Sequence, residues 1–109
     1  MVSPVAGVLL QDAATSGNGT AHDTRGQGRE HTFYVRPSAG TISAGKVKIE
    51  TAHDKDFTGT WALLGAEITL ASGVVQIVQV TGCLRAVRAR ISTTVTGTGG
   101  NVSVSYEAN

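Results

Sequence analysis

The carboxylates that could bind a metal ion lie close together in one short segment. Asp54 and Asp56 flank Lys55 and follow His53. A calcium loop usually supplies three or more acidic ligands with a glycine at a fixed position. The favoured interpretation is therefore a polar turn in which the Asp54 side chain bonds to its own backbone. Asp54 and Asp56 remain the metal candidates of this sequence, and we expect no cofactor.

Catalysis or zinc binding would need imidazoles, thiols or hydroxyls at workable spacing. His22, His31 and His53 are spaced too widely for a short zinc motif. The single cysteine, Cys83, lies where a strand is expected to begin, and a small buried hydrophobic residue explains it better than a nucleophile. The sequence contains no Gly-x-Ser-x-Gly turn and no phosphate loop. We expect a protein that is not an enzyme.

The elements that position these residues are expected to be β-strands. The chain has 109 residues, the length of one domain. Thr, Val and Ile make up 32 of them, and such β-branched side chains suit a pleated surface. No stretch follows the helical period of 3.6, whereas alternation of apolar and polar residues recurs. Glycine, present 14 times, marks the turns between the alternating segments.

The spacing of the turns predicts seven or eight short strands, seven of which the alternation identifies. One of them, at positions 74–80, is apolar at both parities, so we expect the core to cover one face and another subunit or a loop to cover the other. The alternation places Val87, Ala89 and Ile91 on an inner face, with Arg88 and Arg90 opposite. The predicted strands are Val5–Gln11, Glu30–Arg36, Lys46–Thr51, Glu67–Leu70, Val74–Val80, Val87–Ile91 and Val102–Glu107.

Short strands separated by turns predict a single all-β domain over residues 1–109. The expected architecture is one antiparallel β-sandwich, jelly-roll-like, with an immunoglobulin-like topology as the alternative. Residues 13–29 carry hardly any apolar side chain and are expected to form a polar loop or arm that becomes ordered on assembly.

Charge and hydropathy exclude several classes of partner. The net charge is +1 and aromatic residues are 5% of the chain, so we expect no nucleic-acid binding. The longest apolar run near the N-terminus, Val5–Leu10, is too short for a membrane span or a signal peptide, so we expect no membrane partner. A single cysteine suits synthesis in a reducing compartment.

The candidate partner interface combines arginines with apolar residues. Arg85, Arg88 and Arg90 gather on one segment, and arginine favours interfaces. We expect Arg88 and Arg90 to point away from the core and to pair with acidic groups on a partner; a solvated sheet face is the alternative. Val75 and Ile77 complete the set, together with Trp61, which is interpreted as a core or interface anchor.

The order of segments from Lys46 to Tyr106 is similar to that of small β-sandwich virion proteins of tailed bacteriophages. In that family a strand is followed by an Asn/Ser-Asp-Gly loop that leads to a tryptophan, and a later strand reads Trp/Leu-Arg-Tyr-Val-Arg. This chain departs from the pattern in its loop, which reads His53-Asp54-Lys55-Asp56, and at Ala86, where an aromatic residue is common. The segments that carry the resemblance are Lys46–Glu50, Thr60–Leu64, Glu67–Leu70, Val78–Gly82, Leu84–Ile91 and Val102–Tyr106.

The resemblance implies a capsid decoration (cement) protein, made in the host cytoplasm and located on the virion. It also implies the phage major capsid protein or other virion subunits as partners, and a homo-oligomer, with a trimer favoured. The alternative function is a carbohydrate-binding module on a virion or secreted protein. Exposed aromatic rings in one row, formed by Tyr34, Phe57 and Trp61, would favour sugar binding.

Overall fold

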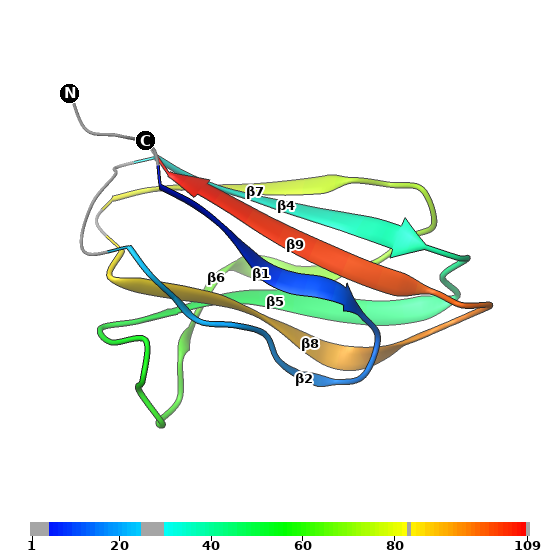
Figure 1. Cartoon of the computed structure of the whole chain (residues 1–109), viewed down its shortest axis with the longest axis horizontal. Coiled ribbons are helices and arrows are strands. Elements are labelled where there is room, and N and C mark those ends of the chain that lie inside the picture. The colour runs from blue at the N-terminus through cyan, green and yellow to red at the C-terminus, as the bar shows by residue number, and fades with distance from the viewer. Residues whose placement is uncertain (1–4, 25–29, 83, 109) are drawn as a thin grey trace.

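The chain folds into two antiparallel β-sheets that pack face to face (Figure 1). The structure is a computed structural model that describes residues 5–24, 30–82 and 84–108. No helix long and apolar enough to cross a membrane occurs among these residues. The strands are β1 (Val5–Ala13), β2 (Gly17–Asn18), β3 (His22–Asp23), β4 (Glu30–Ala39), β5 (Ala44–Ala52), β6 (Ala62–Thr69), β7 (Gln76–Thr81), β8 (Ala86–Thr96) and β9 (Asn101–Ala108).

The strand pairing is that of a jelly roll. β1 pairs with β9, β2 and β3 pair with β8, β4 pairs with β7, and β5 pairs with β6. These pairs are nested like the arms of one long hairpin. Pairing of β4 with β9 and of β5 with β8 rolls the hairpin into sheets of order β1-β9-β4-β7 and β2-β8-β5-β6. The jelly-roll expectation is therefore confirmed in preference to the immunoglobulin-like alternative.

The alternation in the sequence correctly identified the inward faces. Phe33 and Val35 of β4 are fully buried, as are Val47 and Ile49 of β5. The other inward residues belong mainly to β8 and β9, and burial of such apolar side chains at about 25 cal/mol per Å² is the main stabilising term. The buried members on those two strands are Val87, Ala89, Ile91, Val95, Val102, Val104 and Tyr106.

The polar segment that follows β1 is not a free arm. Gly17 and Asn18 pair with Ile91 and Arg90, and His22 pairs with Val87. Gly19 donates its N–H to Ala89 O at 2.7 Å, and Thr20 donates to Leu9 O at 2.9 Å. This segment therefore connects the two sheets, and the expectation of an arm ordered only on assembly is wrong for residues 13–24. Residues 25–29 of the predicted loop lie outside the described residues.

Glycine is required at position 19. A Cβ there would lie 2.2 Å from the Leu9 carbonyl oxygen, well inside any real contact. Only glycine lets the chain pass this close to another backbone.

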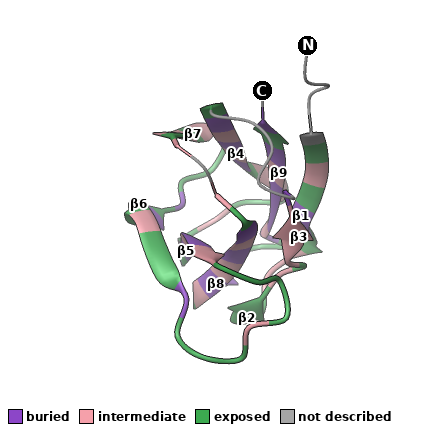
Figure 2. Cartoon of the chain, turned by 90° about the vertical axis from the view of Figure 1, so that its left-hand side faces the viewer, coloured by how far each residue is buried: buried purple, intermediate pink, exposed green. Residues whose placement is uncertain are grey.

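β7 differs from its prediction, because it lies at an edge of its sheet and pairs only with β4 (Figure 2). Val78 and Val80 point inward and are half-buried, whereas Val75 and Ile77 are 56% and 57% exposed. No loop among the described residues covers this outer face. Burial on both faces is therefore not achieved within one chain.

The buried polar pair at the end of the core is His31 and Tyr106. His31 Nε2 donates to the Gly82 carbonyl at 2.8 Å. This leaves Nδ1 as the acceptor for the Tyr106 hydroxyl, at 2.6 Å. The two rings stack with centroids 5.9 Å apart, and the Phe33 ring lies 5.0 Å from that of Tyr106, centroid to centroid. A polar group buried in this way is stabilising only while it keeps its hydrogen bond.

We expect Tyr106→Phe to lower the free energy of unfolding by about 1–3 kcal/mol, because it leaves His31 Nδ1 buried without a donor. Urea denaturation measures the loss. Tyr34→Phe is the matched control, since Tyr34 lies on an outer face, and its change should stay within about 0.5 kcal/mol. Equal losses in the two variants would contradict the role given to the Tyr106 hydroxyl.

Burial also raises the pKa of Tyr106 from 10.0 to about 12. A raised pKa in the folded state contributes stability that is complete below pH 10 and is lost as the pH rises through 12. In the Tyr34→Phe variant, where Tyr106 is the only tyrosine, phenolate absorbance should therefore appear near pH 12. Circular dichroism followed in parallel shows that the protein is still folded. Ionisation near pH 10 in the folded protein would contradict the burial effect.

Candidate functional site

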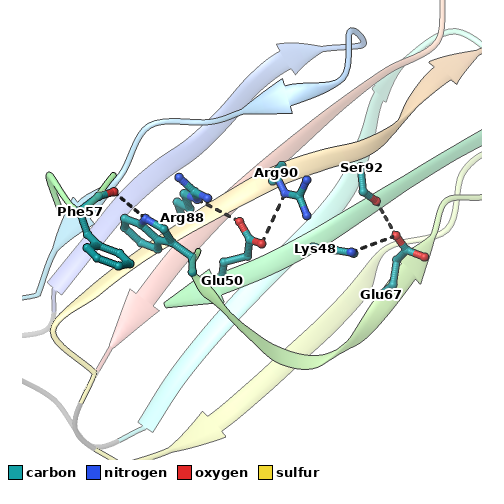
Figure 3. A network of polar contacts seen from close by, with 8 residues as sticks. Lys48, Glu50, Phe57, Glu67, Arg88, Arg90 and Ser92 are labelled. Atoms are coloured by element: carbon teal, nitrogen blue, oxygen red, sulfur yellow. Dashed lines mark hydrogen bonds and ion pairs between the residues drawn. The ribbon is translucent and has the colours of Figure 1, made fainter. Parts of the chain in front are cut away.

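The outer face of the β2-β8-β5-β6 sheet carries most of the charged side chains that the sequence singled out (Figure 3). The register places Glu50 of β5 opposite Arg88 of β8, and Lys48 opposite Arg90. These four residues have the outward parity expected from the alternation. They form a band across β5 and β8, which is therefore the candidate site of the chain.

Glu50 is the centre of this band. Its carboxylate accepts a hydrogen bond from Arg88 Nε at 2.9 Å and forms an ion pair with Arg90 Nε at 3.4 Å. The Glu50 side chain is only 6% exposed and that of Arg88 only 15%. The expectation that both arginines meet acidic groups on a partner is corrected here, because their acidic partner is Glu50 of the same chain.

Trp61 closes one end of the band. The Arg88 guanidinium carbon lies over its indole, 4.3 Å from the ring centroid, and the indole Nε1–H donates to Phe57 O at 2.9 Å. This hydrogen bond and the stacking hold the loop between β5 and β6 against the sheet. Trp61 is 4% exposed, which excludes it as an exposed sugar platform in this chain. It is an anchor, and the residues it contacts belong to its own chain.

The aromatic residues do not form a sugar-binding row. Trp61 is buried, Phe57 packs against His53 with ring centroids 4.9 Å apart, and Tyr34 lies on β4 in the other sheet. The arrangement that would favour carbohydrate binding is therefore not found at these three residues.

The other end of the band is more exposed. Glu67 lies 3.7 Å from Lys46 Nζ and 4.0 Å from Lys48 Nζ, and it accepts a hydrogen bond from the Ser92 hydroxyl at 2.6 Å. The Ser92 hydroxyl, followed by the two lysines, lowers the pKa of Glu67 below its ordinary value. Each of the four basic residues of this face thus has an acidic partner within the chain, but Lys46 and Lys48 share Glu67, and Arg88 and Arg90 share Glu50.

Asp54 and Asp56 line a polar depression together with His53, Lys55, Asp23 and Arg85. Asp54 Oδ1 accepts the Asp56 N–H at 2.8 Å, which is the turn expected from the sequence. Lys55 lies 3.7 Å from Asp56, and Arg85 lies 3.8 Å from Asp23. In the described part of the chain, no three His, Cys, Asp or Glu side chains gather in a geometry that could hold a metal ion.

A second surface, on the outer face of the other sheet, was only partly visible in the sequence. Val8, Ser105, Tyr34 and Ile77 lie side by side in one row across β1, β9, β4 and β7. Val8 and Ile77 are exposed at 54% and 57%. Of the predicted interface residues, Arg85, Val75 and Ile77 are exposed. Arg85 lies just before β8, the strand of Arg88 and Arg90, whereas Val75 and Ile77 lie at the β7 edge of the other sheet, so the structure does not bring the predicted interface set together.

Sequence reasoning missed the burial of Glu50. Its parity was correct, but a glutamate on an outward position is normally solvated. The residues that cover Glu50 were all noted in the sequence: Arg88 and Arg90 pair with its carboxylate, and Trp61 stacks on Arg88. The missing information was that β5 and β8, far apart in the sequence, are adjacent.

Comparisons with known proteins support the fold assignment. No family model matches the chain, and no curated protein matches it in sequence. Among solved structures, the SPBc2 prophage-derived protein YomS is similar over 97% of this chain and 92% of its own, with a TM-score of 0.69 and 16% identity.

Two further solved structures are more distant. One, described as Bacillus endospore appendages that form disulfide-linked pili, has a TM-score of 0.48 and 18% identity over 98% of this chain and 83% of its own. The other, from infectious bursal disease virus strain Gx, has a TM-score of 0.42 and 10% identity over 96% of this chain and 31% of its own. Of the three, YomS is the one whose similarity is high enough to establish a shared fold.

We expect Glu50→Gln to lower the free energy of unfolding by about 3 kcal/mol, because it leaves the largely buried Arg88 without its counter-charge and also removes the ion pair of Arg90. Chemical denaturation measures the effect. Glu67→Gln is the matched control on the same sheet face, and its loss should be clearly smaller because its ion pairs are exposed to solvent. A Glu50→Gln variant as stable as Glu67→Gln would contradict the central position of Glu50.

Proposed function

We propose that this chain is a non-enzymatic structural protein of a bacteriophage particle, and specifically a capsid decoration protein. The observation that carries the proposal is the jelly-roll fold shared with the prophage-derived protein YomS over nearly the whole of both chains. The resemblance of residues 46–106 to small phage virion proteins supports the same class independently of the structure. The proposed location is the capsid surface, after synthesis in the host cytoplasm.

The proposed partners are the phage major capsid protein or other virion subunits. The surface carries exposed apolar side chains at Val8, Leu63, Val74, Val75 and Ile77. Burial of such side chains against a partner contributes favourable free energy to binding. Arg85, with its side chain 59% exposed, offers a cation at a separate place on the surface, beside Asp23. Binding that favours the folded chain raises its apparent stability by mass action, and the same contacts would strengthen the coat.

The test is the composition of purified particles. Particles released from a host that carries the coding sequence are purified on a density gradient, and labelled peptides quantify this chain against the major capsid protein. We expect a constant ratio to the coat protein across the particle peak, while an abundant host protein falls away. Absence of the chain from the peak would contradict a virion role.

Separation of heads from tails tests the finer part of the proposal. A decoration protein should remain with the heads, and its loss should make DNA-filled heads easier to disrupt by heat. If the chain is found with the tails, it is a virion protein but not a decoration protein. The trimer implied by the family resemblance is tested separately, by sedimentation of the isolated chain.

A further inference from the structure

A chemically labile pair of residues lies at the end of β2. Asn18 is the last residue of this strand, its side chain is exposed, and Gly19 follows it. An asparagine side chain can lose ammonia when the next backbone nitrogen attacks its Cγ. The attack is least hindered when the next residue is glycine, which has no side chain. Of the three asparagines, at positions 18, 101 and 109, only Asn18 precedes a glycine.

The fold does not allow this glycine to be replaced. A Cβ at position 19 would lie 2.2 Å from the carbonyl oxygen of Leu9 and 2.8 Å from that of Ala89. A larger residue at position 19 would protect Asn18 from attack, but these two backbone oxygens leave no room for it. The labile pair is therefore retained for as long as position 18 is asparagine.

The pairing of β2 with β8 restrains the reaction. Gly19 donates its N–H to Ala89 O at 2.7 Å, and the next N–H, that of Thr20, donates to Leu9 O at 2.9 Å. While these bonds hold, the Gly19 nitrogen can neither lose its proton nor turn toward Asn18 Cγ. A strand of two residues opens at a lower free-energy cost than the strands of the core. Opening of β2 from β8 therefore controls the reaction.

We propose that Asn18 is a modification site, at which water replaces the side-chain amide when β2 opens from β8. The Gly19 nitrogen loses its proton and bonds to Asn18 Cγ, and the side-chain nitrogen leaves as ammonia. Water then opens the cyclic imide. Cleavage of the new N–Cγ bond gives aspartate, whereas cleavage of the original peptide bond gives isoaspartate. In total, water is consumed and ammonia is released, and neither an oxidant nor a reductant is needed.

The carboxylate of the aspartate product would face Arg90. Asn18 lies directly opposite Arg90 in the register, so the two side chains share the outer face of the sheet. Arg90 Nε lies 3.4 Å from Glu50 but has no hydrogen-bond partner among the described residues. Glu50 is also shared with Arg88. Because β8 lies between β2 and β5, a carboxylate at position 18 approaches Arg90 from the side opposite Glu50 and does not displace it.

The first test follows peptides that contain Asn18 or Asn101 by mass spectrometry during incubation at mildly alkaline pH. The chain is compared in its folded form and in guanidinium chloride. In denaturant Asn18 should be converted, whereas Asn101 should persist because the Val102 side chain hinders attack. In the folded chain the conversion of Asn18 should be at least about tenfold slower, since the Gly19 N–H is bonded. Isoaspartate among the products identifies the imide route, because direct hydrolysis gives aspartate alone.

The second test examines the contact of the product. Asn18→Asp makes the aspartate product directly, and it should raise the midpoint of urea unfolding because it adds a cross-strand ion pair. In an Arg90→Gln background the same substitution should give no increase, and this double-mutant cycle isolates the contact. The increase in the single variant should also shrink with added salt. Circular dichroism verifies that the variants are folded.

Several outcomes would overturn the inference. These are equal conversion of Asn18 in the folded and unfolded chains, no conversion in denaturant, and conversion without isoaspartate. An equal effect of Asn18→Asp with and without Arg90 would overturn the contact assigned to the product. All of these measurements concern the isolated chain, so none bears on the particle composition, which tests the proposed function alone.

Discussion

Neither sheet of this protein can form until segments from opposite ends of the chain meet. β1 has its partner in β9, and β2 and β3 have theirs in β8, so the outermost pairs of the roll join the first quarter of the chain to the last. Only the β5–β6 pair is local. Closing such long loops costs conformational entropy before the contacts compensate for it, so nonlocal β-folds of this type form slowly. The period-two alternation guides the process, because a slip of one residue would turn every core side chain toward solvent.

The alternation also separates the inside of the sandwich from its outside. The inward positions are almost all apolar, whereas the two outer faces differ from each other in charge. Inward positions are filled mainly by Val, Ile, Phe and Leu, and the buried His31 is accommodated because both of its ring nitrogens are bonded. On the outer face of the β2-β8-β5-β6 sheet, Glu50, Arg88 and Trp61 form a second, polar layer. This layer holds the β5–β6 loop against the sheet and adds side-chain contacts to the pairing of β5 with β8. From the alternation alone, Arg88 and Arg90 would be expected to point to solvent and to be available to an acidic partner.

The sequence was sufficient to predict what depends on local pattern. The inward faces of Lys46–Thr51 and Val102–Glu107 follow from alternation, and the number of turns predicts a sandwich. It was insufficient wherever the outcome depends on which strands are neighbours. Gly17–Asn18 and His22–Asp23 are too short to show any period, so their pairing with β8 could not be seen. The burial of Glu50 and the edge position of β7 are likewise set by sheet order. Alternation says which way a side chain points, but not what lies beside it.

The two outer faces therefore differ in what they can offer to a partner. A protein that bound over Arg88 and Arg90 would have to compete with Glu50, which accepts a hydrogen bond from Arg88 and forms an ion pair with Arg90. The free energy gained from a new acidic partner would be offset by the loss of that pairing. The β7 edge and the row that ends at Ile77 have no such internal partner. The side chains of Val75 and Ile77 are exposed to water in the single chain, so covering them breaks no ion pair. The surface of this sandwich that is poorest in charge is thus the one best suited to contact another subunit.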